Sequence, residues 1–198
     1  MTASSFSPQT IGGTAVATGV VALLGLVFII LFFTAGQPFG TLNDVCIGLA
    51  AILSGVLAWV LYPVHHATSP HLSLLALIAA LLGALVVTAG SVLVISGVSS
   101  WYLAGLYMTV GNALIGLWLL AMSCSARQSN PWPGGLVVFG LVLGAVMAVG
   151  LMAVPGILRG IDAQGAAPWF VNAGYIGGLG WLILYPIWCL CLGRTLLL

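Results

Sequence analysis

The chain has 198 residues, of which 62% are hydrophobic and only 3% are charged, and its formal net charge is +1. A water-soluble domain has about a quarter of its residues charged, so this composition excludes a soluble protein and predicts an integral membrane protein. So small a net charge also excludes nucleic acid as a partner, because nucleic-acid binding depends on clustered Lys and Arg. We expect one transmembrane domain over residues 1–198, surrounded by membrane lipids.

Six apolar runs are long enough to cross a hydrocarbon layer of about 30 Å, which takes about 20 residues of helix. Short segments rich in Gly, Pro, Ser and Thr separate them, as is typical of turns. Runs such as Val20 to Phe33 do not alternate polar and apolar residues as barrel strands do. The predicted fold class is therefore all-α, a six-helix transmembrane bundle with short loops. The expected helices, in chain order, are about residues 13–33, 44–64, 72–96, 101–123, 136–157 and 171–193.

The arginines predict the orientation of the bundle. If the N-terminus is cytoplasmic, the inner segments contain Arg127 and Arg194, whereas the outer segments contain Asp44 and the offsetting pair Arg159 and Asp162. Basic residues are enriched on the cytoplasmic side of membrane proteins. We therefore expect both termini in the cytoplasm, which agrees with an even number of spans.

Small residues recur every four positions in the last two expected helices. Gly140, Gly144 and Ala148 do so in the fifth, and Gly174 and Gly178 do so in the sixth. Such faces let helix backbones approach closely, which is how helices associate in a membrane. We predict that the fifth and sixth helices pack closely through these residues, and dimerisation through the same faces is the alternative.

Polar side chains are rare at membrane depth in this sequence. Ionisable residues inside a span mark proton and ion paths, and no expected span has one near its centre. Asn112 is the best candidate for lining a polar cavity, with a hydrogen bond between helices as the structural alternative. A small transporter or channel for a neutral solute would place four of these side chains on one common cavity, namely Thr88, Ser91, Thr109 and Asn112.

Most Trp and Tyr residues lie near the ends of the expected spans, as in the aromatic belts of membrane proteins. Trp118 and Trp181 lie deeper in their spans. They are candidates for contact with a lipophilic ligand or a partner subunit, and ordinary packing is the alternative.

Three histidines cluster at the cytoplasmic end of the second and third spans: His65, His66 and His71. Histidines beside a Pro-containing turn are typical of the membrane interface. Ligation of haem or bacteriochlorophyll would need an imidazole that projects into an apolar cavity, and this remains a minor alternative. A metal site would need further ligands, which the neighbouring sequence lacks. No cofactor is clearly implied.

Three segments resemble those of small, uncharacterised bacterial membrane proteins with six predicted helices: Gly36 to Asp44, Trp101 to Tyr107 and Leu179 to Trp188. The likeness covers most of the chain and depends mainly on Gly, Leu and Trp. It implies a location in the bacterial cytoplasmic membrane, and it implies no particular activity or catalytic residue.

Little of the sequence lies outside the expected spans, and no expected span has a charged residue near its centre. This favours a non-enzymatic protein that acts by associating with other subunits or with a ligand. It would be an accessory or structural subunit of a larger membrane complex, a homo-oligomer, or a binder of a lipophilic ligand. The alternatives are the small transporter or channel and a membrane-embedded enzyme acting on lipid or quinone. Such an enzyme would need His65, His66 or His71 close to charged groups from the same side, where Arg127 and Arg194 are the candidates.

Overall fold

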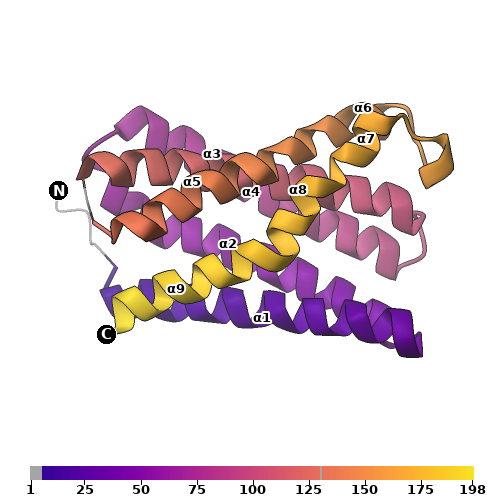
Figure 1. Cartoon of the computed structure of the whole chain (residues 1–198), viewed down its shortest axis with the longest axis horizontal. Helices are drawn as coiled ribbons and strands as arrows, with labels where there is room; N and C mark the ends of the chain where they lie inside the picture. The colour runs from indigo at the N-terminus through magenta and orange to yellow at the C-terminus, as the bar shows by residue number, and fades with distance from the viewer. Residues whose placement is uncertain (1–5, 130) are drawn as a thin grey trace.

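The computed structural model describes residues 6–129 and 131–198, and it is an all-α bundle (Figure 1). Every regular element in these residues is a helix, and six spans there are long and apolar enough to cross a membrane. This confirms the predicted fold class. The spans are α1 (Pro8–Ala35), α2 (Phe39–His66), α3 (Pro70–Ile95), α4 (Trp101–Ser129) and two segmented spans, Gly134–Leu158 and Trp169–Leu197.

The helices extend beyond the apolar runs because residues at their ends stabilise additional turns. Before α1, the hydroxyl of Ser7 accepts a hydrogen bond from the Thr10 backbone N–H at 3.1 Å, and Pro8 occupies the first turn. At its other end, Gly36 adopts a positive φ of 76°, which stops the helix. The second helix follows almost at once, at Phe39, so the connection is short and the two helices are antiparallel.

Consecutive spans pack side by side and form a closed ring. Helix α1 packs on α2, α2 on α3, α3 on α4 and α4 on α5 (Gly134–Ala148), and the last helix, α9 (Tyr185–Leu197), returns to α1. The start of α1 and the end of α9 lie at the same end of the bundle, which we call the terminal end (Figure 1). The opposite end is the distal end.

Glycines let the helices of this ring touch backbone to backbone. A Cβ atom added to Gly83 of α3 would lie 2.5 Å from the Gly111 carbonyl oxygen of α4, and one added to Gly111 would lie 2.7 Å from the Gly83 oxygen. Between α9 and α1, a Cβ on Gly193 would lie 2.9 Å from the Gly12 oxygen. These contacts are the close approaches through which membrane helices gain packing energy.

The fifth span is irregular in the middle. Helix α5 gives way to a 3-10 segment, η1 (Val149–Ala153), which leads into the short helix α6 (Val154–Leu158). Pro155 lies just after the 3-10 segment and has no N–H to donate to the carbonyl of Leu151. The tighter turns therefore occur where the regular ladder of hydrogen bonds is interrupted.

The sixth span has a comparable interruption. It consists of α7 (Trp169–Ala173), α8 (Tyr175–Leu179), a π-helical turn η3 (Gly180–Leu184) and α9. The Tyr185 N–H donates to the Gly180 carbonyl, five residues back, and Pro186 follows directly. Since Pro186 cannot donate to the carbonyl four residues before it, a wider turn accommodates the proline.

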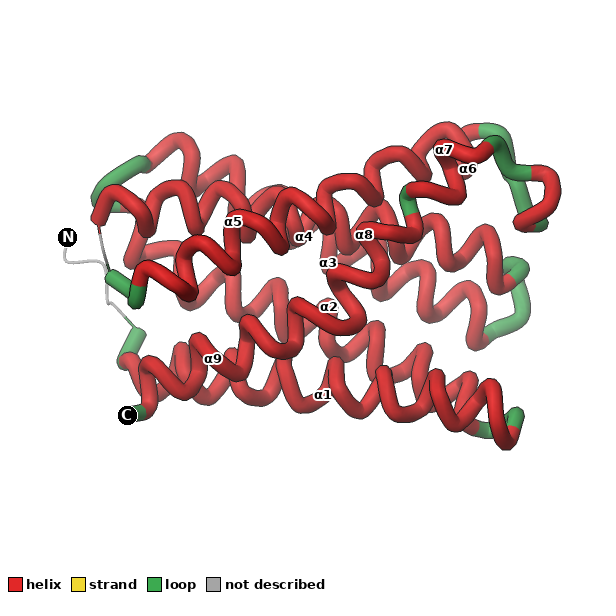
Figure 2. Tube along the Cα trace, in the orientation of Figure 1, coloured by secondary structure: helices red, strands yellow, loops and turns green. Residues whose placement is uncertain are grey.

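The two halves of the sixth span contact different helices. Its distal half packs on η1 and α4, whereas α9 packs on α1, so the span crosses the bundle diagonally (Figure 2). The distal half is held by Tyr102 of α4, whose hydroxyl donates to the Asn172 Oδ1 atom at 2.8 Å. The Tyr175 hydroxyl donates to the Tyr102 carbonyl at 3.2 Å.

Candidate functional site

Five aromatic side chains, which we call the aromatic core, fill the centre and the terminal half of the bundle. The Tyr185 ring stacks on Trp181 with centroids 4.8 Å apart and on Trp188 at 6.3 Å. The Trp188 ring also meets Trp118 and Trp132 edge to face, at 6.4 and 6.2 Å. Residues 181, 185 and 188 share one face of the sixth span, so a single helix contributes three of the five rings.

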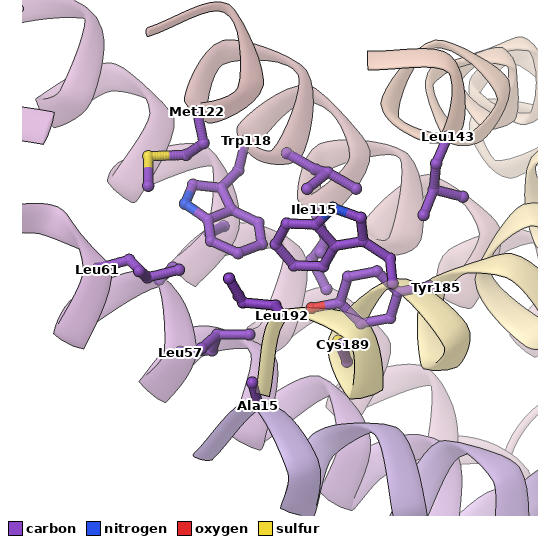
Figure 3. Close-up of a cluster of buried hydrophobic side chains, with 14 of the residues drawn as sticks. Ala15, Leu57, Leu61, Ile115, Trp118, Met122, Leu143, Tyr185, Cys189 and Leu192 are labelled. Carbon is purple, nitrogen blue, oxygen red and sulfur yellow. The ribbon is translucent and has the colours of Figure 1, made fainter. Parts of the chain in front are cut away.

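The aromatic core accounts for the two tryptophans that the sequence places deep in their spans. Trp118 is 1% exposed and Trp181 is 3% exposed, so both pack inside the bundle and neither reaches its outer surface. Figure 3 shows Trp118 and Tyr185 pointing into the space between α2, α4 and α9, where Leu57 and Leu61 also lie. A partner subunit at the outer surface therefore does not touch these rings.

One hydrogen-bonded chain of polar groups crosses this apolar interior. The Tyr185 hydroxyl donates to the Ser54 Oγ atom of α2 at 3.0 Å, and the Ser54 hydroxyl donates to the Ala50 carbonyl at 2.7 Å. Both side chains are fully buried. The pattern of aromatic belts near span ends predicts an interfacial Tyr185, but its side chain lies inside the bundle. The spacing of residues 181, 185 and 188 beside Pro186 is the signal that could have indicated it.

The two partners of this bond are expected to respond unequally to mutation. Tyr185→Phe should lower the free energy of unfolding by about 1 kcal/mol, since Ser54 keeps its bond to the Ala50 carbonyl. Ser54→Ala should cost more, about 1–3 kcal/mol, because it leaves the buried Tyr185 hydroxyl with only the Cys189 thiol, a weak acceptor. Thermal unfolding in mild detergent measures both, and equal losses would contradict the assigned direction of the bond.

The histidines do not share one environment. His65 is fully buried, its Nδ1 atom lies 3.2 Å from the Ser125 Oγ atom of α4, and its ring meets Trp132 at 5.1 Å. His66 and His71 are exposed. The prediction that all three are interfacial residues is therefore wrong for His65, because α2 turns that residue toward α4 and the α4–α5 loop.

The contact of His65 with Ser125 resembles the pairing of a base with a nucleophile, but it is closed to a substrate. Both side chains are buried, and Trp132 of the α4–α5 loop covers the histidine ring. Within residues 6–129 and 131–198, no group of three or more His, Cys, Asp or Glu side chains could hold a metal ion. The arrangement closes the terminal end of the bundle by fastening the loop to α2 and α9.

Two of the polar residues proposed for a solute path lie between α2 and α3. The Thr88 hydroxyl donates to the Ala84 carbonyl of its own helix at 2.8 Å. Ser91 lies against Gly48 of α2, where a Cβ atom would be 3.3 Å from the Ser91 Cβ. These positions serve a contact between helices.

The other two polar residues lie on α4. A Cβ atom on Gly150 of η1 would be 2.7 Å from the Thr109 carbonyl oxygen, so Thr109 belongs to the contact between α4 and the fifth span. Asn112 is 4% exposed, and its Oδ1 atom has no hydrogen-bond partner among the described residues. Thr88 and Ser91 thus belong to the contact between α2 and α3, whereas Thr109 belongs to the contact between α4 and the fifth span. This arrangement does not favour one shared solute path.

The small-residue face of the fifth span packs on a helix other than the predicted one. A Cβ atom on Gly144 would lie 2.8 Å from the Gly116 carbonyl oxygen of α4, and one on Gly116 would lie 3.3 Å from the Ala148 backbone nitrogen. Gly140 faces Ser123 of α4 as well as α9. The predicted partner of this face is therefore corrected to α4, because the sixth span crosses the bundle diagonally.

The fifth and sixth spans do approach closely, through Gly174 of the predicted face and through Gly177, which lies outside it. Gly174 lies against Ala153, whose backbone nitrogen would be 3.1 Å from an added Cβ. Gly178 is further from its neighbours, since the nearest atom, the Thr109 Oγ1, would be 4.0 Å away. Gly177 makes the closest approach, with the Gly150 nitrogen 2.7 Å from its added Cβ.

Two grooves open on the outer surface of the bundle. The α2–α3 groove has a volume of about 460 Å³ and is lined by Ile52, Gly55, Val56, Trp59, Leu81, Ala84, Leu85 and Thr88. The α4–α5 groove, at the terminal end, has a volume of about 400 Å³ and is lined by Arg127, Gly134, Val137, Val138, Leu141 and Val142. Both volumes fall within the range of small-molecule sites.

No protein-family model matches the chain, and neither a curated protein nor a solved structure does. The aromatic core and the His65–Ser125 contact are closed, whereas the two grooves are open to a ligand.

Proposed function

We propose that the protein is a non-enzymatic membrane protein that binds a lipophilic ligand in the α2–α3 groove. It would reside in a bacterial cytoplasmic membrane with both termini in the cytoplasm. The observation that carries the proposal is an open groove whose lining is apolar, in the middle of two membrane-spanning helices. At that depth the surrounding medium is hydrocarbon, so an acyl chain or another lipophile is the ligand that the groove fits.

The shape of the groove supports this proposal. Its floor is made of small residues, because a Cβ atom on Gly55 would lie only 3.3 Å from the Ala84 Cβ. Its sides are larger side chains that are substantially exposed: Trp59 at 56%, Leu85 at 66% and Val56 at 44%. A flexible chain can thus lie between the helices and contact the Trp59 side chain.

The polar content of the groove also fits an apolar occupant. The Thr88 hydroxyl is already bonded to the Ala84 carbonyl, so it needs no polar group from a ligand. Transport through the centre of the bundle is less well supported, since the aromatic core occupies that space. A membrane-embedded enzyme is less well supported too, since the His65–Ser125 contact is buried.

Photolabelling in liposomes tests this function. A phosphatidylcholine with a diazirine on one acyl chain should label peptides of α2 and α3 around Val56 and Leu85. Val56→Trp should fill the groove and reduce that labelling severalfold. Leu75→Trp is the matched control, because Leu75 is a 66% exposed side chain of α3 outside the groove.

Two results would contradict lipophile binding in this groove. One is equal labelling of wild type and Val56→Trp. The other is protection of the groove from the lipid by a co-purifying membrane protein, which would favour the accessory-subunit function instead. Native mass spectrometry from mild detergent on the same preparation identifies any such subunit.

A further inference from the structure

The lining of the α4–α5 groove differs from that of the α2–α3 groove because it includes a charged side chain beside apolar ones. Arg127 is exposed and lines one end of the groove, and it is one of only three arginines in the chain. The rest of the lining is glycine or aliphatic. A guanidinium group beside an apolar groove is complementary to an amphiphile that has an anionic head group and an apolar chain.

The groove lies at the depth where the head group and the chain of a lipid meet. The fourth apolar span ends at Arg127 and the fifth begins at Gly134, so this end of the groove is at the membrane interface. From there the groove follows α5 into the hydrocarbon region, along Val138 and Val142, which are 60% and 56% exposed. Residues four apart lie on one helix face, so they form a continuous apolar strip.

The backbone at the start of α5 is open beside Arg127. A Cβ atom on Gly134 or Gly135 would meet no described atom within 4 Å. Among the described residues, no side chain accepts a hydrogen bond from the first turn of α5, and the Leu136 N–H donates to the Pro133 carbonyl at 2.9 Å. The N–H groups of Gly134 and Gly135 are therefore the ones that can face an anion.

We propose that the α4–α5 groove binds an anionic glycerophospholipid. The Arg127 guanidinium binds the phosphate in a charge-assisted contact, and one acyl chain lies along Val138, Leu141 and Val142. The occupant is a lipid rather than a free phosphate because most of the groove beyond Arg127 is apolar. This site is separate from the α2–α3 groove and does not depend on it.

Competition between two lipids tests the head-group contact. The full chain in mild detergent is mixed with equal amounts of dioleoyl phosphatidylglycerol and dioleoyl phosphatidylcholine, and bound lipid is counted by native mass spectrometry. Wild type should retain mainly phosphatidylglycerol. Arg127→Gln should lower the ratio of the two bound lipids about fivefold, which is the usual effect of one basic residue at an anionic surface. Arg194→Gln is the control, since Arg194 is an exposed arginine of the last turn of α9.

Further variants test the apolar part and keep the two grooves distinct. Val142→Trp should reduce retention of phosphatidylglycerol without lowering the unfolding temperature of the lipid-free protein, whereas Val56→Trp should leave the lipid ratio unchanged. An unchanged ratio in Arg127→Gln, or equal losses in both arginine variants, would overturn the proposal. So would displacement of the lipid by water-soluble glycerol phosphate, which would show a site for a free anion.

Discussion

Replacing Gly144 by Leu is expected to destabilise the bundle by more than about 3 kcal/mol or to prevent its folding. An added Cβ would lie 2.8 Å from both the Gly116 carbonyl oxygen and the Leu120 backbone nitrogen. Backbone atoms cannot rotate away as the end of a side chain can, so α4 and α5 would have to separate. Because lipid is as apolar as leucine, no hydrophobic gain offsets that lost contact.

The matched control for this change is Gly13→Leu in α1. Gly13 is exposed, and a Cβ atom there would meet no described atom within 4 Å. The control should keep or raise the unfolding temperature, since Leu favours a helix over Gly by up to about 1 kcal/mol. Thermal unfolding in mild detergent, followed by circular dichroism, compares the two variants. Wild-type stability of Gly144→Leu would refute the close contact between α4 and α5.

The second large loss of stability is expected on replacing Trp188, which contacts three of the other four rings of the aromatic core. Trp188 is fully buried and its ring contacts Trp118, Trp132 and Tyr185. Trp188→Ala should cost about 3 kcal/mol, at the lower end of the range for buried Trp in soluble proteins. The cost comes from the cavity and the lost dispersion contacts. The free energy of transfer from water contributes little, because a side chain exposed in the membrane would contact lipid instead of water.

Trp169→Ala provides the comparison, because Trp169 is 78% exposed. It should change the unfolding temperature little. Tryptophan fluorescence adds a second measurement, since loss of Trp188 should release Trp132 toward a more polar environment and shift the emission to longer wavelength. Similar stability losses in the two variants would show that the aromatic core does not support the bundle.

The six spans were predictable because their signal is local. A run of about 20 apolar residues can satisfy its backbone hydrogen bonds in lipid only as a helix, whatever its neighbours are. The ends were less predictable, since caps such as Ser7 and Pro8 add turns outside the apolar run. The small-residue faces were recognisable as packing surfaces too, but their partners were not. Gly144 packs on α4 rather than on the sixth span because the sixth span crosses the bundle diagonally, from α4 and η1 to α1.

The candidate sites depended much more on the tertiary structure. His65 and Tyr185 have neighbours in the sequence that are typical of the membrane interface, yet both are fully buried. Whether such a residue points inward depends on the rotation of its helix about the helix axis, and the π-helical turn before Pro186 changes that rotation for Tyr185. The grooves were not predictable either, since each is formed by residues from two helices.

The sequence by itself determined that the chain lies in a membrane, that it is helical, and that few charged groups are present for chemistry. These properties follow from hydrophobicity and scarcity of charge, which act on each segment independently. Only the tertiary structure decided which glycines meet, which aromatics form the core and where grooves open. Those properties depend on crossing angles and on contacts between spans far apart in the chain. Arg127 illustrates the difference. The sequence shows that it is one of few charged residues, but only the structure places the apolar groove along α5 beside it.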